Sequence, residues 1–178
     1  MADERHVRLA GPEHLDAVAQ LYDALTDYLE SHVNYPGWGK DIYPTRETAE
    51  EGLQSGALYV CMVAGAVAGT CILDGIQPER YANVSWQAGN RPDEVLVVHT
   101  LAVYPAYFRR GISETLLQFT DQYARQNGKT SIRLDVLPSN TPGVSLYRKN
   151  GYQLAGELCL QRGPWDQAPF YCFEKIIR

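Results

Sequence analysis

The sequence predicts an α/β (α+β) fold. We expect one mixed sheet of about seven strands, with about four helices distributed over its two faces. Two helix-like runs precede a hairpin in the first half of the chain, and strand-like and helix-like runs alternate in the second half. The chain has 178 residues, which is room for one domain of ordinary size. We therefore expect a single domain over residues 5–178.

The first third of the chain begins with a strand and continues with two helices. Residues 5–9 alternate apolar and polar side chains, as a strand does. Pro12 is suited to the first position of a helix, and Thr45 can cap a second, shorter helix that runs through about residue 55. The apolar positions of the first helix recur at helical spacing and predict a buried face: Leu15, Val18, Tyr22, Leu25 and Leu29.

The middle of the chain contains three strands and a long connection. Residues 57–63 and 66–73 are apolar runs with two residues between them, which is the spacing of a β-hairpin. Residues 74–93 show no clear period, and a connection of that length is usually functional or irregularly packed. Residues 94–103 form the most apolar run, which predicts a central strand buried on both sheet faces.

The last third alternates helices with strands. An amphipathic pattern that begins after the turn at Gly111 and stops at Gly128 predicts a helix. Residues 131–136 alternate as a strand, and Thr141 begins a further helix that ends at Asn150. The chain closes with two strand-like runs, residues 152–160 and 170–177.

Composition excludes several classes of protein. Hydrophobic residues are 45% and charged residues 21% of the chain, which is globular rather than disordered or coiled-coil composition. The net charge of −5 argues against sequence-independent nucleic-acid binding, which depends on Lys and Arg. The sequence shows neither an apolar leader nor a run long enough to span a membrane. Four scattered cysteines without metal-ligand spacing are expected to be buried thiols of a cytoplasmic protein: Cys61, Cys71, Cys159 and Cys172.

The strand-to-helix turn within residues 101–117 carries most of the functional information. A buried strand leads through Arg109, Arg110 and Gly111 directly into a helix, which aims backbone N–H groups and the positive helix end at one point. Such a point binds phosphate. Gly111 permits close approach of a ligand, and the two arginines can add charge-assisted hydrogen bonds. The alternative is an ordinary helix start with solvated arginines.

Together with its surroundings, this turn resembles that of the GNAT superfamily of acyl-CoA-dependent N-acetyltransferases. The resemblance spans nearly the whole chain and is densest from HTLAVYPAYFRRGISETLL to SIRLDVLPSNTPGVSLYRKNGY. It implies a splayed central strand and a loop that binds the pyrophosphate of coenzyme A, formed by Phe108, Arg109, Arg110, Gly111, Ile112 and Ser113. The family usually has Arg or Gln where this chain has Phe108, and Gly or Ala where it has Ser113. Backbone N–H groups, which both substitutions preserve, are expected to make the main contacts.

A second element of the family pattern follows the strand at 131–136. Its residues are Asn140, Gly143, Leu146 and Tyr147. The resemblance implies that Asn140 bonds the pantetheine arm or the helix, and that the Tyr147 hydroxyl lies near the sulfur of coenzyme A. When an amine attacks a thioester a thiolate leaves, and a phenol with an ordinary pKa of about 10 can donate a proton to it. Tyr147 is therefore the candidate general acid; the alternative is that it packs the helix against the sheet.

His99 lies in the apolar central strand. Strand alternation puts it on the same face as Leu101 and Val103 unless a bulge intervenes. Some arylalkylamine-type members of the family are similar in having a histidine at this position, which acts as a base directly or through water. A core histidine is the alternative. The family also polarises the thioester oxygen with a backbone N–H of this strand, here near Leu101, Ala102 or Val103.

The resemblance implies an acetyl-CoA-dependent N-acetyltransferase that moves acetyl to a primary amine of a small molecule or peptide by direct attack in a ternary complex. Acetyl-CoA is then the cosubstrate, no metal is required, no nucleic acid or membrane is a partner, and the protein is a monomer or homodimer. The alternative is a noncatalytic acyl-CoA-binding sensor or interaction module of the same fold. Aromatic residues of the irregular segments either line a pocket for a cationic amine or close the core: Tyr28, Tyr35, Trp38, Tyr43, Tyr81, Trp86 and Trp165.

Overall fold

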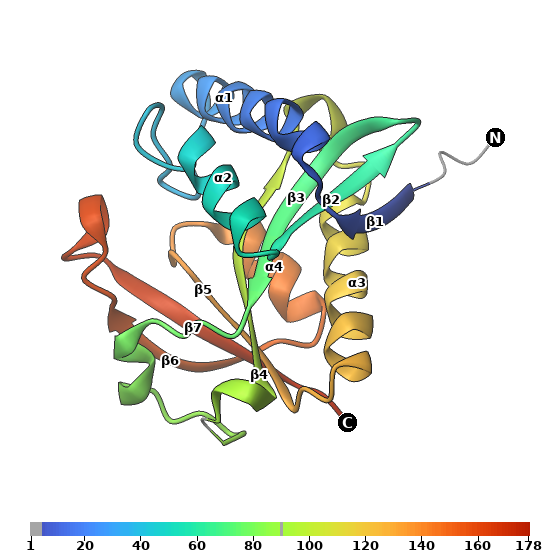
Figure 1. Ribbon diagram of the computed structural model, residues 1–178. Coiled ribbons are helices and arrows are strands. Elements are labelled where there is room, and N and C mark those ends of the chain that lie inside the picture. Colours follow the sequence, from blue (N-terminus) through green and yellow to red (C-terminus); the bar gives the residue numbers. More distant parts are fainter. Residues whose placement is uncertain (1–4, 90) are drawn as a thin grey trace. The chain divides into compact units, whose positions relative to one another are not determined.

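The computed structural model describes residues 5–89 and 91–178, and within them the predicted seven strands and four α-helices are confirmed (Figure 1). The strands are β1 (Arg5–Leu9), β2 (Leu58–Val63), β3 (Ala66–Asp74), β4 (Val95–Val103), β5 (Ser131–Val136), β6 (Gln153–Cys159) and β7 (Pro169–Ile176). The helices are α1 (Leu15–Ser31), α2 (Arg46–Gln54), α3 (Ile112–Gln126) and α4 (Thr141–Lys149). None of the helices in these two ranges is both long and apolar enough to cross a membrane.

The strands form one mixed sheet in the order β1-β2-β3-β4-β5-β7-β6. Neighbours are antiparallel from β1 to β3 and again among β5, β7 and β6, whereas β4 and β5 are parallel. The register between β4 and β5 runs only from Val95 opposite Ser131 to Val97 opposite Arg133. A pairing this short at the start of β4 fits the splayed central strand that the family resemblance implies.

The chain divides into two compact units, and β4 and α3 each pass from one unit into the other. The first unit contains residues 5–34, 38–73 and 99–120, and the second contains residues 35–37, 74–98 and 121–178. Each unit has its own apolar core.

The core of the first unit forms between α1, α2 and the β2–β3 hairpin. The predicted buried face of α1 is confirmed for Val18, Tyr22, Leu25 and Leu29. Pro12 starts a short 3-10 helix, and α1 itself begins three residues later at Leu15. Thr45 caps α2 in a capping box with Thr48, as its hydroxyl and position suggested.

The core of the second unit gathers residues from β4, β6, β7 and the connection between β3 and β4. Its fully buried members include Tyr81, Val95, Val97 and Cys172. The cysteine prediction is confirmed for Cys61, Cys71 and Cys172 and is wrong for Cys159, which is only half-buried. Cys159 ends β6, an edge strand with one side outside the sheet.

Candidate active site

The part of β4 that enters the first unit departs from regular strand geometry at Thr100. This residue has a φ of 48°, in the left-handed region that a β-branched residue rarely adopts. Its hydroxyl is hydrogen-bonded to the Tyr43 hydroxyl, and the following Tyr104 N–H donates to the Ala68 carbonyl over 2.9 Å. The extended backbone is therefore interrupted between His99 and Leu101. The expectation that these two side chains share one face of the sheet depended on an uninterrupted strand, so it does not hold here.

A series of tight turns connects β4 to α3. The N–H of Tyr107 donates to the Tyr104 carbonyl over 2.8 Å, and the N–H of Phe108 donates to the Pro105 carbonyl over 3.1 Å. The N–H of Arg110 donates to the Tyr107 carbonyl over 3.3 Å. Backbone donors for a ligand are therefore expected from Gly111 onward rather than from Phe108, whose N–H is used within the turn.

The start of α3 presents the geometry of an anion site. Arg109 and Gly111 have φ values of 58° and 76°, which reverse the chain sharply just before the helix. The first bond of the helix runs from the Thr115 N–H to the Gly111 carbonyl over 3.0 Å. The N–H groups of Ile112 and Ser113 precede that bond, so they have no carbonyl partner within the helix. They point out of its positive end, where an anion is stabilised.

Two side chains of the predicted phosphate loop face the protein rather than a ligand. The Phe108 ring packs edge-on against Tyr28, with ring centroids 5.2 Å apart, and belongs to the margin of the first core. Ile112 is 2% exposed. Neither side chain is therefore available to a bound phosphate, and the departure from Arg or Gln at position 108 is explained by packing.

Gly69 in β3 sets the position of this helix start, and sequence reasoning did not single it out. A Cβ atom on Gly69 would lie 2.5 Å from Ile112 Cγ2 and 3.2 Å from the Ala102 carbonyl oxygen. Only a glycine lets α3 approach β3 this closely. A glycine inside a strand run was the available signal, since such residues often mark a close approach of another element.

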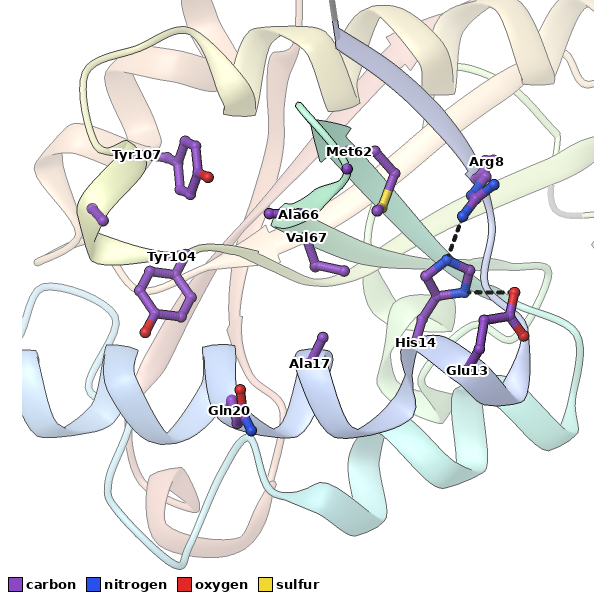
Figure 2. Close-up of a pocket in the computed structure, with 12 residues that line it drawn as sticks. Arg8, Glu13, His14, Ala17, Gln20, Met62, Ala66, Val67, Tyr104 and Tyr107 are labelled. Carbon is purple, nitrogen blue, oxygen red and sulfur yellow. Dashed lines mark hydrogen bonds and ion pairs between the residues drawn. The ribbon is translucent and has the colours of Figure 1, made fainter.

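A pocket of about 630 Å³ borders the same connecting segment in the first unit (Figure 2). Tyr104 and Tyr107 lie at one end, and Arg8, Glu13 and His14 lie at the other, on β1 and on the short 3-10 helix that precedes α1. Arg8 Nη2 lies 2.7 Å from His14 Nε2, and His14 Nδ1 lies 3.3 Å from Glu13 Oε1. The Gly11 backbone N–H donates to the same Nδ1 over 2.9 Å. His14 therefore connects Arg8 of β1 to the turn at Gly11.

Asn140 and Tyr147 belong to the second unit, at the two ends of α4. Asn140 is the N-cap of the helix, and its Oδ1 accepts the Gly143 N–H over 3.0 Å. Tyr147 is half-buried, with its ring 5.8 Å from Tyr152 and 6.3 Å from Phe173, centroid to centroid. The helix-bonding role expected for Asn140 is thus present, and the Tyr147 ring is held in place by an aromatic cluster.

Buried aromatic residues of the second unit mostly pack against one another. Tyr81 and Trp86 have ring centroids 4.9 Å apart, and the Trp86 Nε1–H donates to the Tyr81 carbonyl. The Tyr81 hydroxyl donates to Asp135 over 2.7 Å, and Arg162 forms a two-pronged ion pair with the same carboxylate. Burial, with the nearby Asp135 charge, raises the pKa of Tyr81 well above its ordinary range. Tyr81 and Trp86 therefore close a core, which was one of the two roles expected for the aromatic residues, rather than lining a pocket for an amine.

A buried arginine organises the connection between β3 and β4. The Arg133 side chain is fully buried, and its Cζ lies 4.2 Å from the centre of the Trp86 ring. Its Nη1 donates to Gln77 Oε1 over 2.6 Å. Its Nη2 donates to the carbonyls of Ala88 and Gly89 over 3.1 and 2.9 Å. The irregular segment is thereby attached to β5.

Glu174 on β7 supplies the opposite charge to this network. Its Oε1 lies 3.2 Å from Arg133 Nη2 and accepts the Ser131 hydroxyl over 2.8 Å, and its Oε2 accepts the Gln87 N–H over 2.7 Å. Burial lowers the pKa of Arg133, and the Glu174 charge opposes that effect. Within the described residues 74–89 and 91–93, the long connection is therefore irregularly packed structure attached to a buried ion pair, one of the two possibilities that its length suggested.

Comparison with known proteins identifies the family of this chain. The model of the acetyltransferase (GNAT) family matches residues 18–152. The chain belongs to this family. The match includes β4, the turn at Gly111, α3 and all of α4, so the resemblance predicted from the residue patterns is confirmed.

Individual relatives agree with the family at the levels of sequence and fold. An uncharacterised N-acetyltransferase of Methanocaldococcus jannaschii is 25% identical over 138 residues, which are 74% of this chain and 57% of that protein. The N-alpha-acetyltransferase RimI of Mycobacterium tuberculosis is 37% identical over 76 residues, 43% of this chain and 46% of that protein. The chain spans between 24% and 57% of the length of the curated relatives that it matches.

Solved structures of the family share the fold over almost the whole chain. A GNAT-family acetyltransferase from Streptococcus agalactiae superposes with a TM-score of 0.81 at 22% identity, covering 98% of this chain and 96% of that one. A second, from Listeria monocytogenes, gives 0.72 at 20% identity, covering 97% and 94%. The predicted mixed sheet is therefore the family fold.

Proposed function

We propose that this chain is an acetyl-CoA-dependent N-acetyltransferase that transfers acetyl to a primary amine of a small molecule or peptide by direct attack in a ternary complex. The observation that carries the proposal is the turn at Gly111, where a left-handed glycine opens the first N–H groups of α3 toward one point. Coenzyme A has a pyrophosphate suited to that point. Arg109 and Arg110 are exposed beside it and add positive charge.

We assign a role to each reacting group within its own unit: Tyr147 belongs to the second unit, and His99 and residues 101–103 belong to the first. The amine nitrogen attacks the thioester carbon, the carbon–sulfur bond breaks, and the thiolate takes a proton from the Tyr147 hydroxyl. His99, half-buried in β4, takes the proton that the amine loses, directly or through water. A backbone N–H among Leu101, Ala102 and Val103 polarises the carbonyl oxygen. The left-handed Thr100 supports this assignment, because strand irregularities of this kind gather at active sites.

The acceptor class rests on the names of relatives and on charge. One relative is the streptothricin acetyltransferase of Streptomyces lavendulae, 29% identical over 76 residues, which are 43% of this chain and 39% of that protein. Another is an N-alpha-acetyltransferase. These names cover a small molecule and an α-amine, and a net charge of −5 favours a cationic acceptor of either kind. A cytoplasmic location and a monomeric or homodimeric state stay predictions.

Thiol release from acetyl-CoA across a panel of acceptors tests the proposal. The panel contains polyamines, arylalkylamines, aminoglycosides, amino acids and peptide N-termini, and at least one is expected to accelerate release. Tyr147→Phe should then lower the rate of the chemical step while coenzyme A affinity is nearly unchanged. Unchanged turnover would remove Tyr147 from the mechanism. Replacement of His99 by Ala should flatten the acidic limb of the rate profile, and an unaltered limb returns His99 to the core.

The second candidate is a noncatalytic acyl-CoA-binding module. Phe108 and Ser113, which depart from the family pattern, are the residues that favour it. Measurable coenzyme A binding without turnover of any acceptor would support it over the enzyme.

A further inference from the structure

Arg5 on β1 lies against the turn that begins α3, although about a hundred residues separate them in the sequence. Its Nη1 is 2.9 Å from the position that a Cβ atom would occupy on Gly111. Arg5 is exposed and sits at the start of an edge strand. A glycine at 111 therefore lets the Arg5 guanidinium lie close to the backbone at the helix start, where a Cβ atom would crowd it.

The surroundings of Arg5 differ from those of Arg8, three residues along the same strand. Arg8 is held by His14 within the pocket described above, and His14 faces a carboxylate. Other arginines of the chain are engaged with acids: Arg46 with Asp16 and Glu50, Arg91 with Asp93 and Glu94, Arg133 with Glu174, and Arg162 with Asp135. Within residues 5–89 and 91–178, the ion pairs do not include Arg5.

We propose that Arg5 is a phosphate-binding residue of the coenzyme A site, contacting the pyrophosphate that the N–H groups of α3 hold at Gly111. The inference rests on the proposed function, because it takes coenzyme A to be the ligand of the turn. Arg5 lies outside the matched residues 18–152 and outside the loop at 108–113, so the family pattern does not contain it.

The chemistry of the three groups is complementary. Backbone N–H groups satisfy some of the phosphate oxygens without supplying a full charge. A guanidinium supplies that charge and can donate two parallel hydrogen bonds to one phosphate. Arg109 and Arg110 lie on the loop itself, and the Arg110 guanidinium stacks 5.1 Å from the centre of the Tyr107 ring. Arg5 approaches from a different element, so the site is closed by β1 as well as by the loop.

Direct binding of coenzyme A, measured by calorimetry without any acceptor, tests the inference. Arg5→Ala should weaken binding about tenfold, and Arg5→Lys should lose less, because it keeps the charge but not the planar donor pair. Arg8→Ala is the matched control, since it removes the same charge from the same strand, and its affinity should stay within about twofold of the original. The loss in Arg5→Ala should also shrink as salt is raised.

A second ligand identifies which phosphate is contacted. With 3′-dephospho-coenzyme A, the fold-loss caused by Arg5→Ala should be the same as with coenzyme A. A loss that disappears with this ligand would place Arg5 on the 3′-phosphate and overturn the pyrophosphate assignment. Equal affinity of the original protein and Arg5→Ala for coenzyme A, with both folded by circular dichroism, overturns the inference and leaves the proposed function standing. If the original protein itself does not bind coenzyme A, the proposed function is what fails.

Discussion

The turn before α3 and the network around Arg133 both depend on arginine, and they use it in opposite ways. At the turn, Arg5, Arg109 and Arg110 are exposed and gathered around the positive end of a helix. In the network, Arg133 is fully buried, and Glu174, two backbone carbonyls and an aromatic ring surround it. Exposed positive charge beside a helix N-terminus marks a place for an anion, whereas charge neutralised inside the protein marks structure.

The two regions also differ in what a substitution should change. Removing charge at the turn should change ligand affinity and leave folding nearly intact, because exposed charges contribute little to stability. Removing charge in the network should strongly lower the free energy of unfolding, since an unpaired buried charge is costly.

The largest effect is expected at the buried pair. Arg133→Met leaves Glu174 charged and two carbonyls without their donor, so the free energy of unfolding should fall by about 3–5 kcal/mol. Chemical denaturation measures it. Arg91→Met is the control, because its ion pairs are on the surface, and it should cost less than about 1 kcal/mol. The double variant Arg133→Met with Glu174→Met should be less destabilised than the sum of the single variants; a strictly additive result would show that the pair is not coupled.

A smaller effect is expected where β3 meets the start of α3. Gly69→Ala places a Cβ atom 2.5 Å from Ile112 Cγ2, so it should cost about 1–3 kcal/mol and also weaken coenzyme A binding by displacing the helix start. Combining it with Ile112→Ala removes the clashing methyl group. The combined variant should lose less than the sum of the two single losses. If the two losses simply add, the contact between residue 69 and Ile112 does not position the turn.

Alkaline pH should act on buried ionisable groups of the second unit. Burial, followed by the Asp135 charge, raises the pKa of Cys172 to about 12. The folded protein keeps this thiol proton at pH values where the unfolded chain loses it. The contribution is fully present below a pH of about 8.5 and is lost as pH rises toward 12, by up to about 1.4 kcal/mol per pH unit.

Urea denaturation at a series of pH values measures this slope. Other buried thiols and phenols add to it, so Cys172→Ala is read as a difference: its slope above pH 9 should be shallower than that of the original protein. Val97→Ala, in the same core, should lower stability without changing the slope. The same slope in Cys172→Ala would mean that this thiol ionises as easily in the folded protein as in the unfolded chain.

The smallest effect is expected at Phe108. Phe108→Gln restores a residue that the family usually has, yet the ring packs against Tyr28 and its backbone N–H is used within the turn. We expect a loss of about 1 kcal/mol in stability and a change of less than about twofold in coenzyme A affinity. A clear gain in affinity would contradict the view that this position contributes packing rather than phosphate binding.

Much of the fold was predictable because local patterns agree with it. The helical stripe on α1, the two-residue gap in the β2–β3 hairpin and the alternation in β5 each specify one element without help from distant residues. The partial exposure of Cys159 was not predictable, because an apolar run does not reveal whether its strand lies at the edge of the sheet. The buried ion pair of Arg133 could not be predicted either, since its partners come from the segment at 77–89 and from β7.

For the site, the sequence by itself determined the turn: a buried strand, two arginines and a glycine leading into a helix are contiguous, so their chemistry can be read from their order. Only the tertiary structure decided what surrounds that turn. It placed Arg5 beside Gly111, Gly69 under Ile112 and the Phe108 ring against Tyr28. Those contacts join residues far apart in the chain, and they depend on strand order and on how closely a helix packs against the sheet, which local spacing does not encode.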